Sequence, residues 1–396
     1  MHGYPPAPEA RVTRANLFVP PYNRWAFQHM RELMPTTRIS RGTGPVRPLG
    51  EAKRDFSTLR YTLADGSTGE LDTLFDTAYT DALVVLHRGQ VVLEEYLNGM
   101  SADSLHQMMS VTKSFTGMMV LHAAQLGLLD LAAPVVQYIP ELAGSAWSTA
   151  TVQHAVDMTT GVEFDEVYDD PNGSFMQYTV GAGFAEAPEG YQGARTTFDA
   201  LQNMRELGTH GDTFHYVTPN TEVAGLVLAR TTGKGLAQWC SEVIWQQIGA
   251  EHDAYIIVDR VGTQLAGAGL NATARDLARV GQMLLDGGTV GDAQVLAPEV
   301  VRTIAAGGDR DVFARGLPVE PDAAYHGWSY RNCWWYTHNA HAAYTGIGIN
   351  GQWLYIDPAA EMVLVMQSSN PLADDATIDD VLLRAFHAIA RELRAV

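Results

Sequence analysis

The sequence is short of cysteine and of long apolar runs. Cys240 and Cys333 are its only cysteines; they lie far apart without a C-x-x-C pattern, which argues against a disulfide framework and a zinc site. No segment approaches the ~18 consecutive apolar residues of a membrane span, and the N-terminus lacks the apolar core of a signal peptide. These absences predict a soluble, cytoplasmic protein with no membrane partner, no metal and no cofactor.

Positive charge is also scarce. The chain has 396 residues and a formal net charge of −19, which argues against nucleic acid or an anionic membrane as a partner. This length predicts two domains, or one domain with a large insertion. Composition leaves a small-molecule substrate as the expected partner, and it leaves open whether the chain forms a homodimer.

Lysine is rarer still, and its placement is informative. The three lysines are Lys53, Lys113 and Lys234, and the many arginines stay protonated and cannot act as bases. Ser110 and Lys113 lie three residues apart at the start of a predicted helix, so their Cβ atoms are about 5–6 Å apart on one face. A buried amine there can take the serine's proton, which is the chemistry of a serine nucleophile with a lysine base. On these residues alone, a helix-capping serine beside a solvated lysine is the favoured interpretation, so the context has to decide.

A serine nucleophile also needs donors for the oxyanion that forms on the substrate. Ser110 supplies one backbone N–H by its place at a helix N-terminus. The glycine-rich stretch 345–351 is a candidate for the second, because its glycines let a strand edge approach the substrate; a tight strand entry is an equal alternative. No G-x-S-x-G or H-E-x-x-H motif is present, and His338 and His341 lack a third metal ligand.

The pattern of elements predicts an α+β fold. Strands are expected at both ends of the chain, at 82–87, 91–96, 326–337, 352–356 and 362–366. Helices are expected at 23–34, 132–138, 152–158, 221–230, 236–248, 273–285 and 377–393, besides the one that starts at Ser110. The expected organisation is an arm at 1–22, a sheet domain from 23–105 and 310–396, and a mainly helical domain at 106–309. Within the last, the glycine- and aromatic-rich loop 161–193 is predicted to be a lid.

Several motifs together resemble a known family. Ser110–Ser114, Thr273–Arg279 and Gly348–Gln352 resemble the β-lactamase-related, penicillin-recognising serine hydrolases. More narrowly, segments 23–27, 138–145 and 346–352 resemble the nylon-oligomer amidases of this family, and the likeness runs from about residue 23 to about 370. The resemblance implies an antiparallel sheet flanked by helices plus an all-helical domain, with the active site between them.

The resemblance also implies roles for further residues. Tyr216, in the segment 214–220, matches the family's catalytic tyrosine, and Ile349 its second oxyanion N–H. The β-lactamase Lys-Thr-Gly triplet is replaced by Ile347-Gly348-Ile349, which argues against a β-lactam substrate. The substrate-binding positions implied by the resemblance are Tyr168, Thr179, Phe184, Gly267 and Ile347; efficient nylon-oligomer hydrolases carry Asp, Trp and Asn where this chain has Thr179, Phe184 and Gly267.

The expected function is hydrolysis of linear amides, such as 6-aminohexanoate dimers, and of small carboxylic esters through an acyl-enzyme. Ser110 would attack, Lys113 would hold or accept its proton, and Tyr216 would pass that proton to the leaving group. Two alternatives remain open: a carboxylesterase with little amidase activity, and an acylating sensor or binding protein without turnover.

Overall fold

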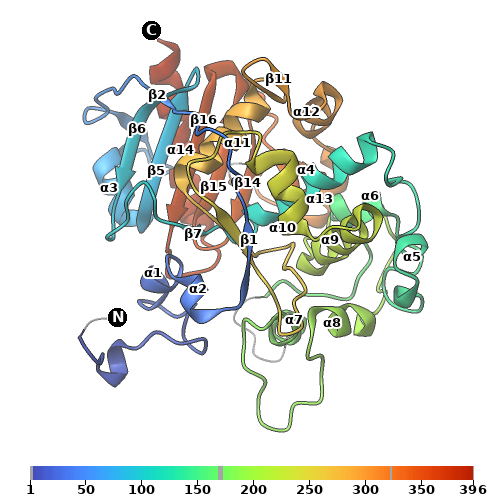
Figure 1. Cartoon of the computed structure of the whole chain (residues 1–396). Helices are drawn as coiled ribbons and strands as arrows, with labels where there is room; N and C mark the ends of the chain where they lie inside the picture. Colours follow the sequence, from blue (N-terminus) through green and yellow to red (C-terminus); the bar gives the residue numbers. More distant parts are fainter. Residues whose placement is uncertain (1–2, 168–172, 322, 396) are drawn as a thin grey trace.

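The structure, a computed structural model, describes residues 3–167, 173–321 and 323–395. Its largest sheet is built from both ends of the chain, as predicted (Figure 1). The apolar runs in β5 (Thr80–His87) and β16 (Met362–Ser368) are buried throughout, because each lies inside the sheet and is covered on both faces. In spatial order the strands are β12 (Ser329–Arg331), β13 (Trp334–Tyr336), β14 (Tyr344–Gly348), β15 (Gln352–Asp357), β16, β5, β6 (Gln90–Tyr96) and β2 (Gly50–Glu51).

Every neighbouring pair in this sheet is antiparallel except β2 and β6. The predicted hairpin 82–96 is formed by β5 and β6, which pair across the tight turn between His87 and Gln90. The α+β class and the antiparallel sheet expected from the sequence are therefore confirmed.

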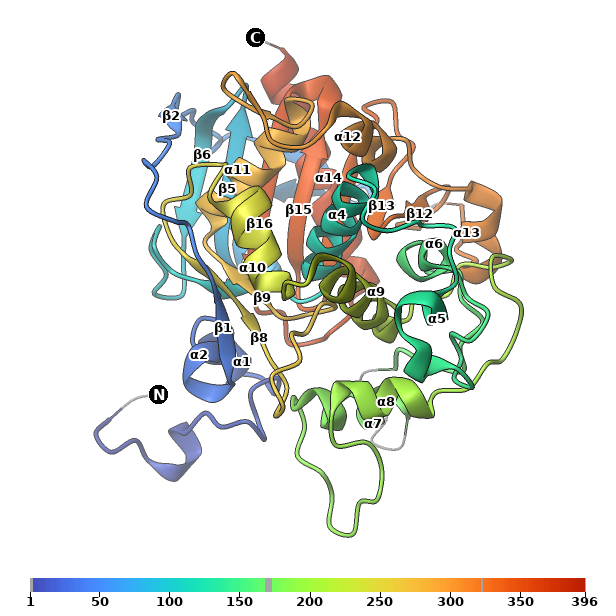
Figure 2. The same ribbon diagram turned by 45° about the vertical axis from the view of Figure 1, so that its right-hand side comes forward.

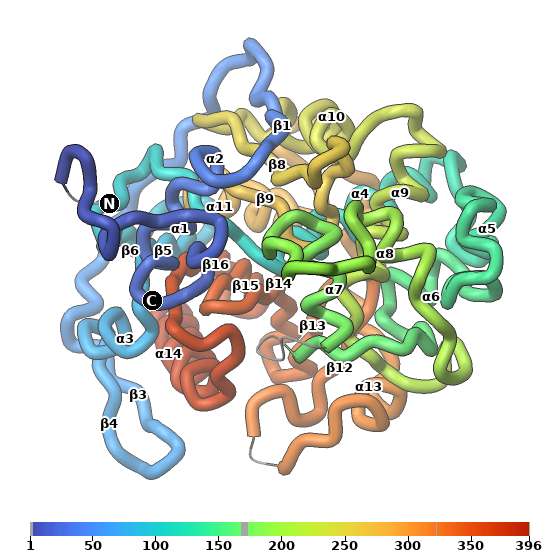
Figure 3. The backbone as a smooth tube through the Cα atoms, turned by 90° about the horizontal axis from the view of Figure 1, so that it is seen from below, coloured from blue at the N-terminus to red at the C-terminus, as the bar shows by residue number. Residues whose placement is uncertain are grey.

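Two helices cover opposite faces of the sheet, and Figure 3 shows the strands lying between them. On one face, Phe386 of α14 (Ala376–Arg394) packs against Trp353 and Tyr355 of β15, with ring centroids 5.7 and 5.5 Å apart. On the other face, α11 (Ala274–Leu285) presents Gly281, where a Cβ would lie 2.4 Å from Val363 Cγ1. The absence of a side chain at this glycine lets the helix approach the sheet closely.

The central helix of the molecule is α4 (Val111–Gln125), which begins directly after Ser110. Figure 2 shows it lying between the sheet and α9 (Thr218–Thr232), and it contacts both. Nearly all of its side chains are buried, including polar ones such as Lys113, Ser114 and Thr116. A helix that is buried all round is a core helix rather than a surface helix, so the solvated-lysine interpretation is wrong.

The remaining elements surround this core. A second, four-stranded sheet has the order β1 (Thr36–Ile39), β8 (Ala254–Ile257), β9 (Leu270–Ala272) and β7 (His106–Gln107). Two short hairpins pair β3 (Arg60–Thr62) with β4 (Thr68–Glu70), and β10 (Thr289–Val290) with β11 (Ala293–Gln294). The other helices are α1 (Asn23–Ala26), α2 (Met30–Leu33), α3 (Leu71–Thr77), α5 (Val135–Tyr138), α6 (Val152–Val156), α7 (Ser174–Ala182), α8 (Thr197–Asn203), α10 (Leu236–Cys240), α12 (Pro298–Ala305) and α13 (Arg310–Gly316).

The structure differs from the sequence prediction in at least four segments. The strand expected at 326–337 is a hairpin of β12 and β13. The helix expected at 23–34 is two short helices, α1 and α2, because the backbone leaves the helical region at His29. The helix expected at 236–248 continues past α10 as a π-helical turn, Ser241–Trp245. The segment 161–193, expected to be a loop, contains α7. The proposed division into domains remains a prediction; α11, from within 106–309, packs on the large sheet.

The described part of the chain contains no helix that is both long enough and apolar enough to cross a lipid bilayer.

Candidate active site

Ser110 and Lys113 face each other at the start of α4. Lys113 Nζ donates a hydrogen bond to Ser110 Oγ over 2.7 Å and another to the Gly267 carbonyl oxygen over 3.0 Å. Ser110 is the N-cap residue of the helix, and its side chain makes no capping bond, so its hydroxyl remains directed toward the lysine. The i, i+3 spacing has therefore placed the two side chains in contact, as the sequence analysis expected.

The environment of Lys113 favours a neutral amine. Its side chain is 1% exposed, and burial lowers the pKa of Lys113 because the charged ammonium loses its hydration. The carboxylates of Glu166 and Glu222 oppose this shift and raise the pKa, but burial is the larger effect. An uncharged lysine in contact with a serine hydroxyl has a lone pair available to accept the proton.

Strand β14 ends against the N-terminus of α4, and glycines make this approach possible. A Cβ on Gly348 would lie 2.6 Å from the Met108 carbonyl oxygen and 2.9 Å from the Ser110 nitrogen. Any side chain at this position would therefore clash with the backbone just before α4. Met109, just before Ser110, has a positive φ of 46°, an unusual conformation for a residue with a side chain. The glycine-rich stretch thus closely approaches the helix that carries Ser110, while its expected approach to a substrate remains a prediction.

The approach brings two backbone donors to one cavity. Ser110 and Ile349 both line it, and neither of their backbone N–H groups has a hydrogen-bond partner among the described residues. Ile349 follows Gly348 directly, in the turn between β14 and β15, and Asn350 next to it has a positive φ of 60°. Two backbone N–H groups that line one cavity without a partner are available as donors to a bound molecule.

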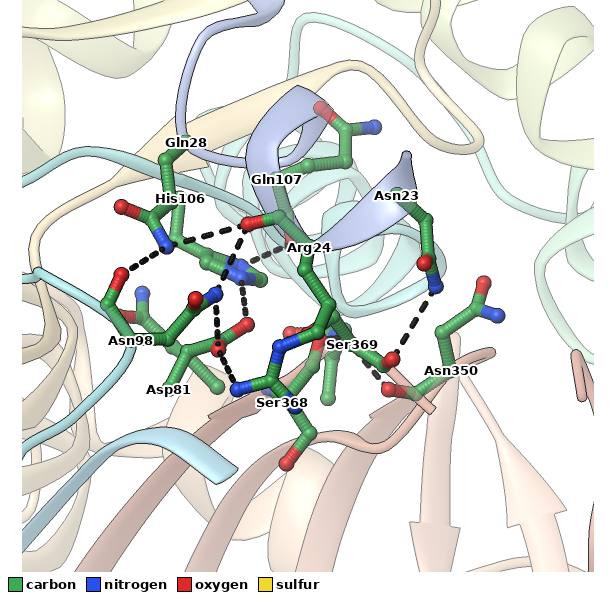
Figure 4. Close-up of polar contacts among 12 residues, drawn as sticks. Asn23, Arg24, Gln28, Asp81, Asn98, His106, Gln107, Asn350, Ser368 and Ser369 are labelled. Carbon is green, nitrogen blue, oxygen red and sulfur yellow. Dashed lines mark hydrogen bonds and ion pairs between the residues drawn. The ribbon is translucent and has the colours of Figure 1, made fainter. Parts of the chain in front are cut away.

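The turn that carries Ile349 is anchored by buried asparagines (Figure 4). Asn350 Nδ2 donates to the Asn370 carbonyl oxygen over 2.9 Å, and the Asn370 N–H donates to the Asn350 carbonyl oxygen over 3.2 Å. Asn23, from α1, donates from Nδ2 to the same Asn370 carbonyl oxygen over 3.0 Å and to that of Ser369 over 3.1 Å. A residue near the start of the chain thus helps to hold this turn near its end.

Helix α1 is in turn fixed to the large sheet through the fully buried Asp81 of β5. Asp81 accepts a hydrogen bond from Asn98 Nδ2 over 2.8 Å, lies 3.1 Å from His106 Nε2 and forms an ion pair with Arg24 over 3.6 Å. Figure 4 shows these residues converging beneath α1. The contacts explain why a segment of only four helical residues keeps a defined position.

Tyr216 lies beside the Ser110–Lys113 pair. Lys113 Nζ lies 5.0 Å from the centre of the Tyr216 ring, which also stacks on Trp335 at a centroid distance of 5.6 Å. Burial and the nearby Glu166 carboxylate raise the pKa of Tyr216 well above its usual value, while a hydrogen bond with Ser110 opposes the shift. The phenol therefore stays protonated over the working range of pH and remains a proton donor next to the serine.

A cavity of about 650 Å³ opens beside Ser110. Its size suits a small organic molecule, and most of its lining side chains are apolar. Of the predicted substrate-binding residues, Thr179 and Phe184 line it, the former from α7 and the latter just after it. Other lining residues include Met109, Phe175, Met176 and Leu372.

Two predicted substrate-binding residues, Gly267 and Ile347, are not among the described residues that line the cavity. Gly267 lies behind Lys113, and its carbonyl oxygen accepts the lysine's second hydrogen bond. A Cβ at Gly267 would lie 2.8 Å from Thr218 Cγ2, so a larger side chain does not fit at this position without a shift. Ile347 lies within β14, paired with Trp353. Tyr168 falls outside the described residues.

Sequence reasoning missed Glu222, which supports the lysine. Glu222 is 2% exposed and accepts hydrogen bonds from the N–H groups of Ala266 over 2.8 Å and Gly267 over 3.0 Å, and from the Tyr178 hydroxyl over 2.6 Å. It thereby holds the loop whose Gly267 carbonyl receives Lys113. The sequence does contain a signal for Glu222, since it is an acidic residue within the apolar stretch of the helix predicted at 221–230. A carboxylate buried in such a helix needs hydrogen-bond donors.

Two further features were missed. Glu166 lines the cavity and accepts a hydrogen bond from the Thr218 N–H over 2.9 Å as well as one from the Thr218 hydroxyl. The N-terminal arm, predicted at 1–22 without a role in the site, also lines the cavity with residues 14, 15 and 18–20. A segment without periodicity gives no sequence signal for such packing.

The described residues contain no cluster of three or more side chains suited to bind a metal. His338 Nε2 lies 2.7 Å from Ser329 Oγ, and His341 Nδ1 lies 2.7 Å from Asp357 Oδ2. Cys240 and Cys333 are free and buried.

The fold and the site together define a class of protein. An antiparallel sheet covered by helices, with a serine and a lysine one turn apart at the start of a buried core helix and a cavity beside them, is typical of the penicillin-recognising serine hydrolases.

Comparison with known proteins supports this assignment. The Beta-lactamase family model matches residues 75–387, so the chain belongs to the β-lactamase family and is a hydrolase. The chain is 35% identical over 372 residues to 6-aminohexanoate-dimer hydrolase of Paenarthrobacter ureafaciens, covering 94% of this chain and 91% of that protein.

Solved structures with the same fold support this family. One named "Putative 6-aminohexanoate-dimer hydrolase from Bacillus anthracis" is 33% identical, covers 99% of each chain and has a TM-score of 0.90. A family VIII carboxylesterase shares the fold at 17% identity, with a TM-score of 0.56 over 80% of this chain and 97% of that chain.

The arrangement around Glu222 leads to a prediction about pH dependence. Glu222→Gln removes a carboxylate that raises the pKa of Lys113, so the pKa of the lysine should fall further. If the neutral lysine is the active form, the acidic limb of the kcat/KM profile should then move to lower pH. The measurement is kcat/KM for an ester from pH 4 to 10. Glu242→Gln, which removes an exposed partner of Lys234, is the control. An acidic limb that stays in place in Glu222→Gln would contradict this coupling.

Proposed function

We propose that this hydrolase cleaves linear amides and small carboxylic esters through an acyl-enzyme formed on Ser110. The observation that carries the proposal is the 2.7 Å contact between Ser110 Oγ and a buried Lys113 Nζ whose pKa is lowered. The lysine accepts the serine's proton as the oxygen attacks the carbonyl carbon, and the N–H groups of Ser110 and Ile349 bind the resulting oxyanion.

Collapse of the tetrahedral intermediate requires a proton on the leaving group. Tyr216, protonated and close to both Ser110 and Lys113, delivers it to the amine or alcohol and is reprotonated through Lys113. Water then attacks the acyl-enzyme by the same path in reverse and releases the acid. The cycle consumes one water for each bond cleaved and uses no cofactor.

The proposed substrate class follows from the cavity and the relatives. A mainly apolar cavity beside Ser110 suits an extended aliphatic chain, and the relative from Paenarthrobacter is a hydrolase named for 6-aminohexanoate dimers. Thr179 and Gly267 occupy positions where efficient members of that group carry Asp and Asn, so we expect weak activity on the dimer itself. The fold shared with a carboxylesterase supports esters as alternative substrates.

The first test separates a lysine base from a lysine that supplies only charge. Lys113→Arg keeps the positive charge but cannot accept a proton, so it should lower kcat/KM about as much as Lys113→Ala, by roughly 10²-fold or more. Lys234→Arg, on an exposed ion pair, should retain wild-type activity. The assay uses p-nitrophenyl esters with product identification by mass. Lys113→Arg activity within tenfold of wild type would show that the lysine is not the base.

The second test separates amidase from esterase through Tyr216. An amine leaves poorly unless its nitrogen is protonated, whereas p-nitrophenolate leaves without help, so Tyr216→Phe should lower amide hydrolysis by roughly 10²–10⁴-fold and ester hydrolysis less. The informative quantity is the ratio of the two losses in kcat/KM, measured with 6-aminohexanoate dimer and a p-nitrophenyl ester. Tyr336→Phe is the control. Equal losses would mean that Tyr216 activates the serine and is not specifically the leaving-group acid.

A further inference from the structure

The N-terminal arm forms one wall of the cavity next to Ser110. Arg14, Phe18 and Val19 line it together with α7 and the turn at Ile349. Figure 3, the view from below, shows the arm and α7 on the same side of the molecule. Although the arm contains only one short helical turn from residue 3 on, Pro8–Ala10, it is held in place by fully buried Leu17 and by Val12.

The Phe18 ring is held between two other phenylalanine rings. Its ring packs edge-on against Phe27, which is fully buried behind α1, with centroids 6.1 Å apart. On the other side it packs edge-on against Phe184 at 5.5 Å. Phe27 in turn packs against the buried His106 at 5.9 Å. This support from the core keeps the Phe18 ring at the cavity wall.

Arg14 connects the arm to the end of α7. Its guanidinium donates a hydrogen bond to the Gly183 carbonyl oxygen, at the helix C-terminus, where a cation is favourable. Gly183 has a φ of 84°, the left-handed conformation that ends the helix, and Phe184 follows it. The arm and α7 are thus joined at two points, one polar and one aromatic, on the same side of the cavity.

From these contacts we propose that Phe18 is a specificity-determining residue that limits the length of the aliphatic chain the cavity accepts. Arg14 is a positioning residue: by binding the Gly183 carbonyl oxygen, it holds the neighbouring Phe184 at the cavity wall. The inference deepens the proposed function, since it rests on Ser110 being the nucleophile of this cavity. It predicts an upper limit on the length of a linear chain, because the Phe18 and Phe184 rings, in contact with each other, form a wall of the cavity that a longer chain would meet.

The test is a chain-length profile of kcat/KM. One series varies the acyl chain of p-nitrophenyl esters from two to twelve carbons, and a second varies the alcohol of acetate esters. Phe18→Ala should raise kcat/KM for the longest chains relative to the shortest by about tenfold in the series whose chain meets the arm, which is the discrimination that one or two methylenes give in an apolar pocket.

Two further variants keep the test decisive. Arg14 is exposed, so Arg14→Ala is expected to fold, and it should shift the profile in the same direction by a smaller factor. Phe75→Ala, at a half-buried phenylalanine of α3 that does not line the cavity, is the matched control and should leave the profile unchanged. If neither Phe18→Ala nor Arg14→Ala changes either profile, the arm does not set specificity. If Ser110→Ala keeps the hydrolysis, the proposed function itself is wrong.

Discussion

The structure depends on keeping one amine out of water. An ammonium group carries a large desolvation penalty, so Lys113 can be buried beside Ser110 only where the surroundings tolerate a neutral amine and satisfy its hydrogen bonds. The Gly267 carbonyl and the Ser110 hydroxyl provide those bonds. Helix α4 is packed between the sheet and α9, and Glu222 fixes the loop that carries Gly267. The core of the protein is therefore also the support of its proposed base.

Both ends of the chain meet at this site. The C-terminal part of the chain supplies β14, the Ile349 turn and the carbonyl groups of residues 369 and 370. The N-terminal part supplies Asn23 and the arm that lines one side of the cavity. Asp81 fixes the N-terminal segment to the sheet. Because the Asn23 contacts join residues more than 300 positions apart, the Ile349 turn takes this position only when both ends of the chain are assembled. The site is consequently a property of the complete fold rather than of one local motif.

Much of this could be predicted from the sequence, and the limits have physical causes. The apolar runs of β5 and β16 and the Ser110–Lys113 spacing are local patterns, and both gave correct elements. The glycines of 346–348 indicated a close approach, but only the structure shows that the partner is the start of α4. The arm and the role of Glu222 depend on long-range packing, which leaves no periodic pattern. Helix α7 was missed because glycines and aromatics surround its short sequence.

The central claim is that Ser110 is activated by a lysine held neutral by burial. The most direct measurement is the rate of labelling by a fluorophosphonate as a function of pH, with the labelled peptide identified by mass spectrometry. The account predicts a single adduct on Ser110, formed at a rate that rises with pH and reaches a plateau well below the ordinary lysine pKa. A label on another residue, or a rate that still rises at pH 10, would contradict it.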